Sequence, residues 1–208
     1  MPNDTGLTGW TLMLPLGGNE HLPWYHHPQE NKAIIVSWDD VPETQLSIWS
    51  SQGYVEAIFQ YGKVLLEKNE FENAWKLFSN GAEKNDKFCV FYLGVMLSEG
   101  LGRNINSELA FKKYLLAADL GHIDSQYNVA QAYLRGNNTQ QNIQKAIYYF
   151  DLAAKQGDPE SNYNLGIFYF LGDLIPKDLK KALYYFESAL KAGFEPADGY
   201  IKLIKENL

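Results

Sequence analysis

The sequence contains little cysteine, little histidine and no excess of basic charge, and each shortage excludes a class of function. Cys89 is the single cysteine among 208 residues, so the chain can form neither an internal disulfide nor a zinc site made of several thiolates. The 18 Lys and Arg residues are outnumbered by 25 Asp and Glu residues, and the formal net charge is -7. Because this charge repels phosphate backbones and anionic lipid surfaces, we expect no nucleic-acid partner and no membrane partner.

Long apolar runs are missing as well. Residues 1–30 lack the basic start and the continuous apolar stretch of a secretion signal. No segment reaches the roughly 18 consecutive apolar residues that a membrane-spanning helix needs. Hydrophobic residues nevertheless make up 46% of the chain and aromatic residues 14%, which is enough to form a core. The sequence therefore predicts a folded, soluble, cytoplasmic protein.

Recognisable catalytic motifs are equally scarce. There is no Gly-x-Ser-x-Gly segment, and Gly100-Leu101-Gly102 lacks the Lys-Ser or Lys-Thr pair that follows a phosphate-binding loop. Cys89 has no histidine near it in the sequence, so we interpret it as a buried packing thiol rather than a nucleophile. His122 follows a glycine and is expected to lie exposed at the start of a helix. We predict no catalytic residue and no cofactor.

One cluster near the N-terminus has the residue types of metal ligands. Its spacing matches no defined metal site, and Pro23 and Pro28 exclude a helical His-Glu-x-x-His arrangement. We predict no bound metal, although a metal-dependent protein or enzyme that uses this histidine loop remains an alternative. The cluster consists of Glu20, His21, His26, His27 and Glu30.

An internal period of 36 residues organises the larger part of the chain. Alanine recurs at positions 74, 110, 146 and 182, and an aromatic residue follows each alanine one helical turn later. Steps of three and four between apolar residues within each copy indicate helices. A unit of this size cannot bury its apolar face alone, so the copies must stack on one another. The aromatic series is Phe78, Tyr114, Phe150 and Phe186, and glycine recurs as Gly121, Gly157 and Gly193.

Each copy is predicted to contain two antiparallel helices. A side-chain oxygen that can cap the second helix stands four residues before the alanine, and the recurring glycine suits the left-handed residue just past the helix end. Small residues such as Gly94 and Ala110 allow the paired backbones to approach closely, while Tyr114 and Phe150 fill the space between successive pairs. The capping residues are Asn106, Asn142 and Asp178.

This pattern is similar to that of the Sel1-like repeats, a subclass of the tetratricopeptide-like superfamily. The fourth copy shows it most fully, with Leu165-Gly166, the segment 178–182 and Gly193, while the first copy departs most, with Glu70 and Asn85 at two signature positions. The resemblance implies an all-α fold, a right-handed α-solenoid of about four helix hairpins. We place the hairpins at residues 53–86, 87–121, 122–157 and 158–193, followed by a C-terminal capping helix over residues 194–208.

Residues 1–52 differ in composition from the repeats. They hold four of the five tryptophans, five of the eight prolines and six acidic residues against Lys32 alone. We predict a mostly irregular segment with a short strand over Ala33–Trp38 and a helix over Pro42–Trp49 that has Pro42 at its first position. Its large apolar residues argue against a free tail, so we expect it to cover the open end of the array.

If the first helices line the concave side, as in similar arrays, a column of aromatic residues faces inward. Tyrosine combines a large contact area with a polar tip, so this column predicts a partly apolar protein-binding groove. The alternative is that these rings only pack in the core. In a groove, replacing Tyr127 and Tyr163 by Ala weakens binding and leaves the helical content intact. The predicted groove consists of Phe59, Phe91, Tyr127, Tyr163, Gln131, Ile167, Leu134 and Phe170.

These observations predict a non-enzymatic protein-binding scaffold, which is also what the resemblance implies. A sharper hypothesis is a bacterial immunity protein that neutralises a cognate toxin domain by direct binding, because an acidic binder attracts a basic surface. A regulatory adaptor that bridges two proteins remains an alternative. The sequence leaves the identity of the partner and the oligomeric state open.

Overall fold

The structure is a computed structural model that describes residues 11–14, 22–27 and 32–206. The chain forms two compact units, Met1–Glu70 and Phe71–Leu208. The boundary between them falls inside the first predicted hairpin, residues 53–86, between its two helices. The division of the chain into a cap segment and four hairpins therefore stays a prediction.

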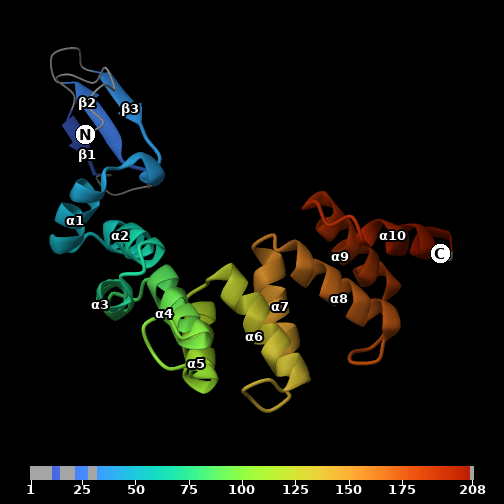
Figure 1. Ribbon diagram of the computed structural model, residues 1–208. Helices are drawn as coiled ribbons and strands as arrows, with labels where there is room; N and C mark the ends of the chain where they lie inside the picture. The colour runs from blue at the N-terminus through green and yellow to red at the C-terminus, as the bar shows by residue number, and fades with distance from the viewer. Residues whose placement is uncertain (1–10, 15–21, 28–31, 207–208) are drawn as a thin grey trace. The chain divides into compact units, whose positions relative to one another are not determined.

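The N-terminal unit contains a small antiparallel sheet in the order β1-β2-β3 (Figure 1). β1 (Thr11–Met13) pairs with β2 (Trp24–His27), and β2 pairs with β3 (Lys32–Ile35). Of these strands the sequence predicts the last one, which it places at Ala33–Trp38. β1 and β2 have three and four residues, and neither contains a run of β-branched residues such as Ile34-Ile35-Val36, which marks the position of β3 in the sequence.

Two helices, α1 (Glu43–Ser51) and α2 (Val55–Glu67), complete this unit after a short 3-10 turn at Trp38–Asp40. Pro42 stands immediately before α1 rather than at its first position, so the predicted helix exists but begins one residue later. The rings of Trp38 and Trp49 meet edge to face with centroids 6.1 Å apart in the core of the unit. Val41, Leu46 and Ala57 are buried around them.

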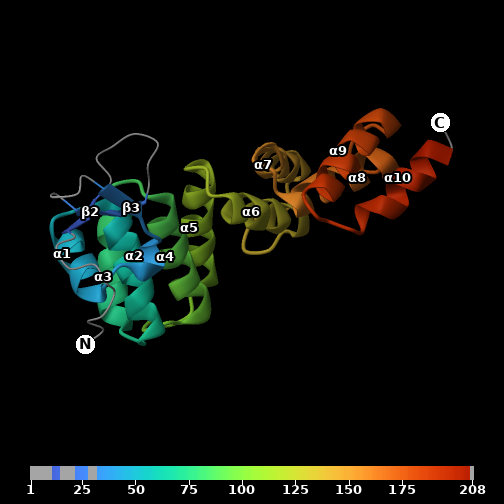
Figure 2. The same ribbon diagram turned by 90° about the horizontal axis from the view of Figure 1, so that it is seen from above.

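The C-terminal unit is a succession of helices, each packed on its neighbours along the chain (Figures 1 and 2). The pairs α4–α5, α6–α7 and α8–α9 form hairpins, α3 packs on α4, and α10 packs on α9. This arrangement confirms the expected α-solenoid and the helix at its C-terminal end. The helices are α3 (Phe71–Glu83), α4 (Lys87–Glu99), α5 (Ser107–Asp119), α6 (Ile123–Arg135), α7 (Ile143–Lys155), α8 (Pro159–Leu171), α9 (Leu179–Lys191) and α10 (Ala197–Glu206).

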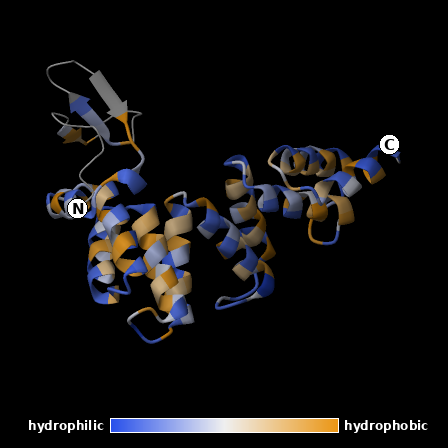
Figure 3. Ribbon diagram, turned by 45° about the horizontal axis from the view of Figure 1, so that its top comes forward, coloured by the Kyte–Doolittle hydropathy of each residue, from blue (hydrophilic) through white to orange (hydrophobic). Residues whose placement is uncertain are grey.

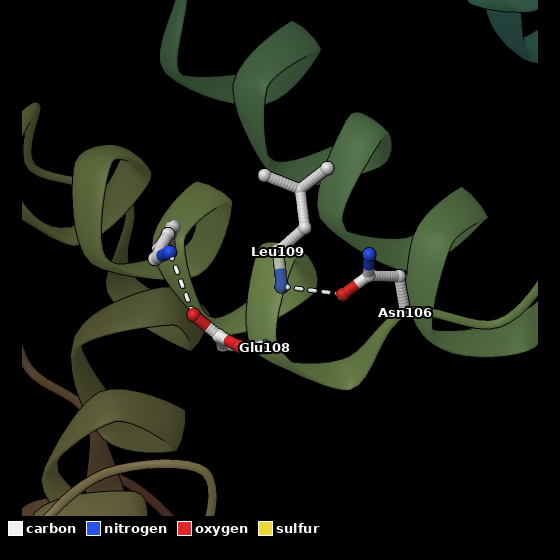
Figure 4. Close-up of polar contacts among 4 residues, drawn as sticks. Asn106, Glu108 and Leu109 are labelled. Atoms are coloured by element: carbon white, nitrogen blue, oxygen red, sulfur yellow. Dashed lines mark hydrogen bonds and ion pairs between the residues drawn. The ribbon is translucent and has the colours of Figure 1, made fainter.

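The predicted caps are present at the starts of α5, α7 and α9. At the start of α5, Asn106 Oδ1 accepts a hydrogen bond from the backbone N–H of Leu109 at 2.9 Å (Figure 4). Glu108 forms an ion pair with Lys112 one turn further along the same helix. Asn142 and Asp178 cap α7 and α9 in the same way. The glycines at the helix ends adopt positive φ angles, and Asn85, which replaces glycine in the first copy, does so too, with φ 60°.

The helix pairs approach each other at positions that have no side chain. A Cβ added to Gly94 would lie 2.7 Å from the Tyr114 ring, and one added to Gly166 would lie 2.8 Å from the Phe186 ring. Phe78, Phe150 and Phe186 are fully buried at the 36-residue period. Among the described residues, no helix is long and apolar enough to cross a lipid bilayer.

Replacing Gly166 by Ala is expected to destabilise the C-terminal unit by about 1–3 kcal/mol, because the new Cβ would overlap a buried ring. Gly199→Ala in α10 is the matched control. Nothing lies within 4 Å of its new Cβ, so the better helix propensity of alanine is expected to stabilise the helix by about 0.4–1 kcal/mol. Urea unfolding followed by circular dichroism compares the variants. Equal effects of the two substitutions would contradict the close-packing argument.

Candidate protein-binding site

The aromatic column that the sequence predicts is distributed over both units. Phe59 lies in α2 of the N-terminal unit and is buried. Phe91, Tyr127 and Tyr163 lie in α4, α6 and α8 of the C-terminal unit, one on the first helix of each hairpin, and are half-buried. The last three therefore occupy equivalent positions and keep part of each ring accessible.

Each of these three rings also packs on another ring, which belongs to the next hairpin for Phe91 and to the same hairpin for Tyr127 and Tyr163. Phe91 stacks on His122 with ring centroids 4.4 Å apart, and Tyr127 meets Phe150 edge-on at 5.9 Å. Tyr163 meets Phe186 at 5.7 Å. The rings thus take part in packing within and between hairpins, as the alternative core interpretation expects, and are also partly exposed.

The C-terminal end of the column is covered by the chain itself. Phe194, just before α10, lies 4.9 Å from Tyr163, and Tyr200 of α10 packs on both Tyr163 and Phe170. Ile167 packs against the same core cluster. Three of the predicted groove residues, Tyr163, Ile167 and Phe170, are therefore engaged by the end of the array.

A cavity in the middle of the C-terminal unit includes one residue of the predicted groove, Gln131. The cavity has a volume of about 230 Å³ and is bordered by the end of α4, one side of α5, α6 and the loop that follows α6. Figure 3 shows that this loop is hydrophilic, whereas the helices carry alternating hydrophobic and hydrophilic residues. Leu134, another predicted residue, packs against the core cluster next to it. The lining residues are Ser98, Ser107, Ala110, Phe111, Tyr114, Asn128, Val129, Gln131, Ala132, Arg135, Asn137 and Asn138.

Several polar groups converge on this cavity. The hydroxyls of Ser98 and Tyr114 are 2.9 Å apart, and burial raises the pKa of the Tyr114 phenol, which keeps it protonated. Gln131 Nε2 donates to the Tyr127 hydroxyl at 3.1 Å, while Gln131 Oε1 is buried without a hydrogen-bond partner. An apolar cavity edged by a few placed polar groups is the usual form of a site that receives a ligand side chain.

Of the residues that line this cavity, the predicted groove contains Gln131 alone. Asn128, Gln131 and Arg135 are spaced three and four residues apart, a signal for one helix face that could have been read together. Tyr114 was assigned only to packing, because its ring belongs to the 36-residue aromatic series. Its hydroxyl, however, reaches Ser98 at the cavity.

The expectation that His122 is exposed was wrong. His122 is only 6% exposed, because Phe91 stacks on its ring and Phe88 approaches it edge-on at 5.3 Å. Its Nδ1 accepts the backbone N–H of Ser125 at 3.2 Å and so caps α6. A capping histidine is easily misread from sequence, since serine, threonine, aspartate and asparagine usually fill this position.

The other candidate groups have structural roles or lie outside the description. Cys89 is fully buried at the start of α4, as predicted for a packing thiol. His26 and His27 belong to strand β2 rather than to a loop, and Glu20, His21 and Glu30 lie outside the described residues. Within residues 11–14, 22–27 and 32–206, no group of three or more His, Cys, Asp or Glu side chains could hold a metal ion.

Comparison with known proteins identifies the repeated unit. The Sel1 repeat family matches residues 88–122, 123–158 and 159–194, just over half of the chain. The solved Sel1 repeat protein from Oxalobacter formigenes superposes with a TM-score of 0.74 at 26% identity, covering 78% of this chain and 48% of that one. The protective antigen c5321 of uropathogenic Escherichia coli strains, which displays an SLR fold, gives a TM-score of 0.66 at 26% identity, covering 74% and 34%.

A curated relative is the chitin synthase regulatory factor 2 of Schizosaccharomyces pombe. It is 29% identical over 121 residues, which are 52% of this chain and 22% of that protein. The chain thus spans less than half the length of each of these three relatives.

The burial of His122 predicts that the folded protein loses stability in mild acid. Burial lowers its pKa below the usual value of about 6.5, a larger effect than those of Asp124 and Asp86, which raise the pKa, and of Lys87, which lowers it. Because the folded chain favours the neutral ring, this stabilisation is fully present above about pH 6.5 and is lost as the pH falls through the lowered pKa. Protonation also removes the Nδ1 acceptor that caps α6.

Urea unfolding between about pH 7.5 and about pH 5 tests this expectation, with His122→Asn as the control. Asparagine can cap the helix and does not titrate, so the variant is expected to lose less stability over this range than the unchanged protein. The same pH dependence in both proteins would assign the effect to other groups.

Proposed function

Because the chain belongs to the Sel1 repeat family, whose members generally mediate protein–protein interactions, we propose that it is a non-enzymatic scaffold that grips a segment of a partner protein. The family is generally without enzymatic activity, and the relative named as a regulatory factor is consistent with a role in binding. The groove on the first helices of the hairpins is the proposed contact surface.

The observation that carries this proposal is the cavity between α4, α5 and α6. Its lining includes Gln131, a residue of the predicted groove whose amide donates to the Tyr127 hydroxyl, and it lies at a part of the array that α10 does not cover. A half-buried tyrosine next to a cavity of about 230 Å³ can hold a side chain of a partner and add contact area around it.

A sharper form of the proposal is that the partner is a toxin domain with a basic surface, which the protein neutralises as an immunity protein. Support comes from charge. Residues 1–70 contain nine acidic residues and three lysines, whereas residues 71–208 contain 16 acidic and 15 basic residues. An acidic N-terminal unit would accelerate encounter with a basic partner, and the groove would then provide short-range contacts.

A second candidate function is that of an adaptor that bridges two proteins. It is favoured by Tyr148 and Tyr184, which stand 36 residues apart on α7 and α9 and are 57% and 65% exposed. Exposed tyrosines at equivalent positions of two successive second helices could serve as anchors for another partner.

Co-expression with the products of the neighbouring genes, followed by affinity capture and native mass measurement, tests these functions. A complex with one toxin-domain chain is expected if the protein is an immunity protein, and its association rate should fall steeply as salt is raised. Two different proteins bound at once would favour the adaptor. The absence of any protein partner would contradict both.

In such a complex, Tyr127→Ala is expected to weaken binding by about tenfold or more while the far-ultraviolet circular dichroism spectrum stays unchanged. Tyr163→Ala is the matched comparison. Because Tyr163 packs on Phe194 and Tyr200, its replacement is expected to lower the unfolding midpoint as well. Binding that survives Tyr127→Ala would exclude this part of the groove from the contact, and unfolding of Tyr127→Ala would favour a purely structural ring.

A further inference from the structure

Some polar atoms at the cavity between α4, α5 and α6 have hydrogen-bond partners, and one buried atom has none. Gln131 uses its amide nitrogen to donate to the Tyr127 hydroxyl at 3.1 Å, but its carbonyl oxygen, Oε1, is buried and has no hydrogen-bond partner. A buried acceptor without a donor is rare in folded proteins, because an unpaired buried polar group costs free energy. Gln131 lines the cavity, and because Oε1 itself is buried, a group that enters supplies the donor once the Gln131 side chain turns towards it.

The hydroxyl pair at the same cavity leaves a second acceptor. Ser98 Oγ donates its only proton to the carbonyl oxygen of Val95 at 3.0 Å. The 2.9 Å contact between Ser98 and Tyr114 must therefore be donated by the Tyr114 hydroxyl. The proton of Tyr114 is then used, and its oxygen keeps the capacity to accept a hydrogen bond. Two side chains that line the cavity thus offer acceptors rather than donors.

Arg135 decides which donor fits. Its guanidinium group is permanently charged, carries only donors and belongs to the same lining. A lysine or arginine side chain would satisfy the two acceptors but would be brought near this positive charge. A carboxylate would suit Arg135 but would face the oxygens of Gln131 and Tyr114 without a proton to share. A primary carboxamide suits both, because its NH2 group donates and its carbonyl oxygen accepts.

We propose that this cavity recognises the side-chain carboxamide of a glutamine or asparagine in an extended segment of the partner protein. The NH2 group donates to Gln131 Oε1 and Tyr114 Oη, and the carbonyl oxygen accepts from Arg135. The apolar lining of Ala110, Phe111 and Val129 contacts the methylene groups of the same side chain. This inference rests on the proposed function, because it names the chemistry of the segment that the groove would bind.

The experiment selects binders from a phage-displayed library of random peptides on the full chain. Peptides selected on the unchanged protein are expected to share a glutamine or asparagine at one position. Replacing that residue by glutamate or lysine in a synthetic peptide is expected to weaken binding by about tenfold, measured by fluorescence anisotropy. A shared acidic or basic residue at this position would overturn the proposal.

Substitutions in the cavity test the same assignment from the side of the protein. Gln131→Leu removes the free acceptor, and Tyr114→Phe removes the other while keeping the ring that packs on Gly94, so each is expected to weaken binding of the selected peptide by about tenfold. Gln144→Leu, at an exposed position of α7, is the matched control and should leave the affinity unchanged. Circular dichroism and the unfolding midpoint check that each variant is folded.

Gln131→Glu offers a sharper discrimination, because it keeps the size and the acceptor of the side chain and adds a negative charge. Selection on this variant is expected to shift the shared residue from a carboxamide to lysine or arginine. Peptides that bind but are insensitive to Gln131 and Tyr114 would overturn this inference and leave the proposed function standing. Failure to select any binding peptide would count against the segment-binding function itself.

Discussion

The array depends on large rings that occupy the space above residues without side chains. Tyr114 and Phe186 each lie against a glycine of the preceding helix, Gly94 and Gly166, closer than a Cβ atom would allow. This pairing brings the two helices of a hairpin together and leaves the other edge of each ring for the next contact. A hairpin cannot bury these rings by itself, so its stability comes from its neighbours and the unit forms as a stack.

The same rings link packing to the proposed site. Tyr114 fills the space at Gly94, yet its hydroxyl meets Ser98 at the cavity. Tyr127 contacts Phe150 of the next helix, and its hydroxyl accepts from Gln131. Because the hydrophobic part of each tyrosine is held by packing, its polar end has a defined position, which a binding site on a flexible loop would lack. The proposed site therefore consists of the outer ends of side chains whose inner parts hold the hairpins together.

The structural features that recur in every repeat could be predicted from the sequence, whereas features that depend on one local set of contacts could not. The helices, the caps at Asn106, Asn142 and Asp178 and the helix-ending glycines follow from a period of 36 residues, because each copy adopts the same backbone. Strands β1 and β2 contain no run of β-branched residues, and the burial of His122 depends on two rings from α4, Phe88 and Phe91. The cavity could not be predicted for the same reason, because its lining comes from α4, α5, α6 and a loop. Whether Gln131 Oε1 finds a hydrogen-bond partner depends on the distances between these elements.

The distribution of charge separates two contributions to binding. Residues 1–70 hold nine acids against three lysines, while the array, residues 71–208, is close to balance with 16 acids and 15 bases. Long-range attraction depends on net charge and mainly raises the rate of encounter, whereas discrimination between similar segments depends on buried polar groups that a wrong side chain leaves unpaired. A nearly neutral array can therefore select by hydrogen-bond pattern, because its own field neither attracts nor repels one kind of charged side chain strongly. The unpaired oxygen of Gln131 matters in such a surface, since donor and acceptor geometry then separates a carboxamide from an ammonium or a carboxylate.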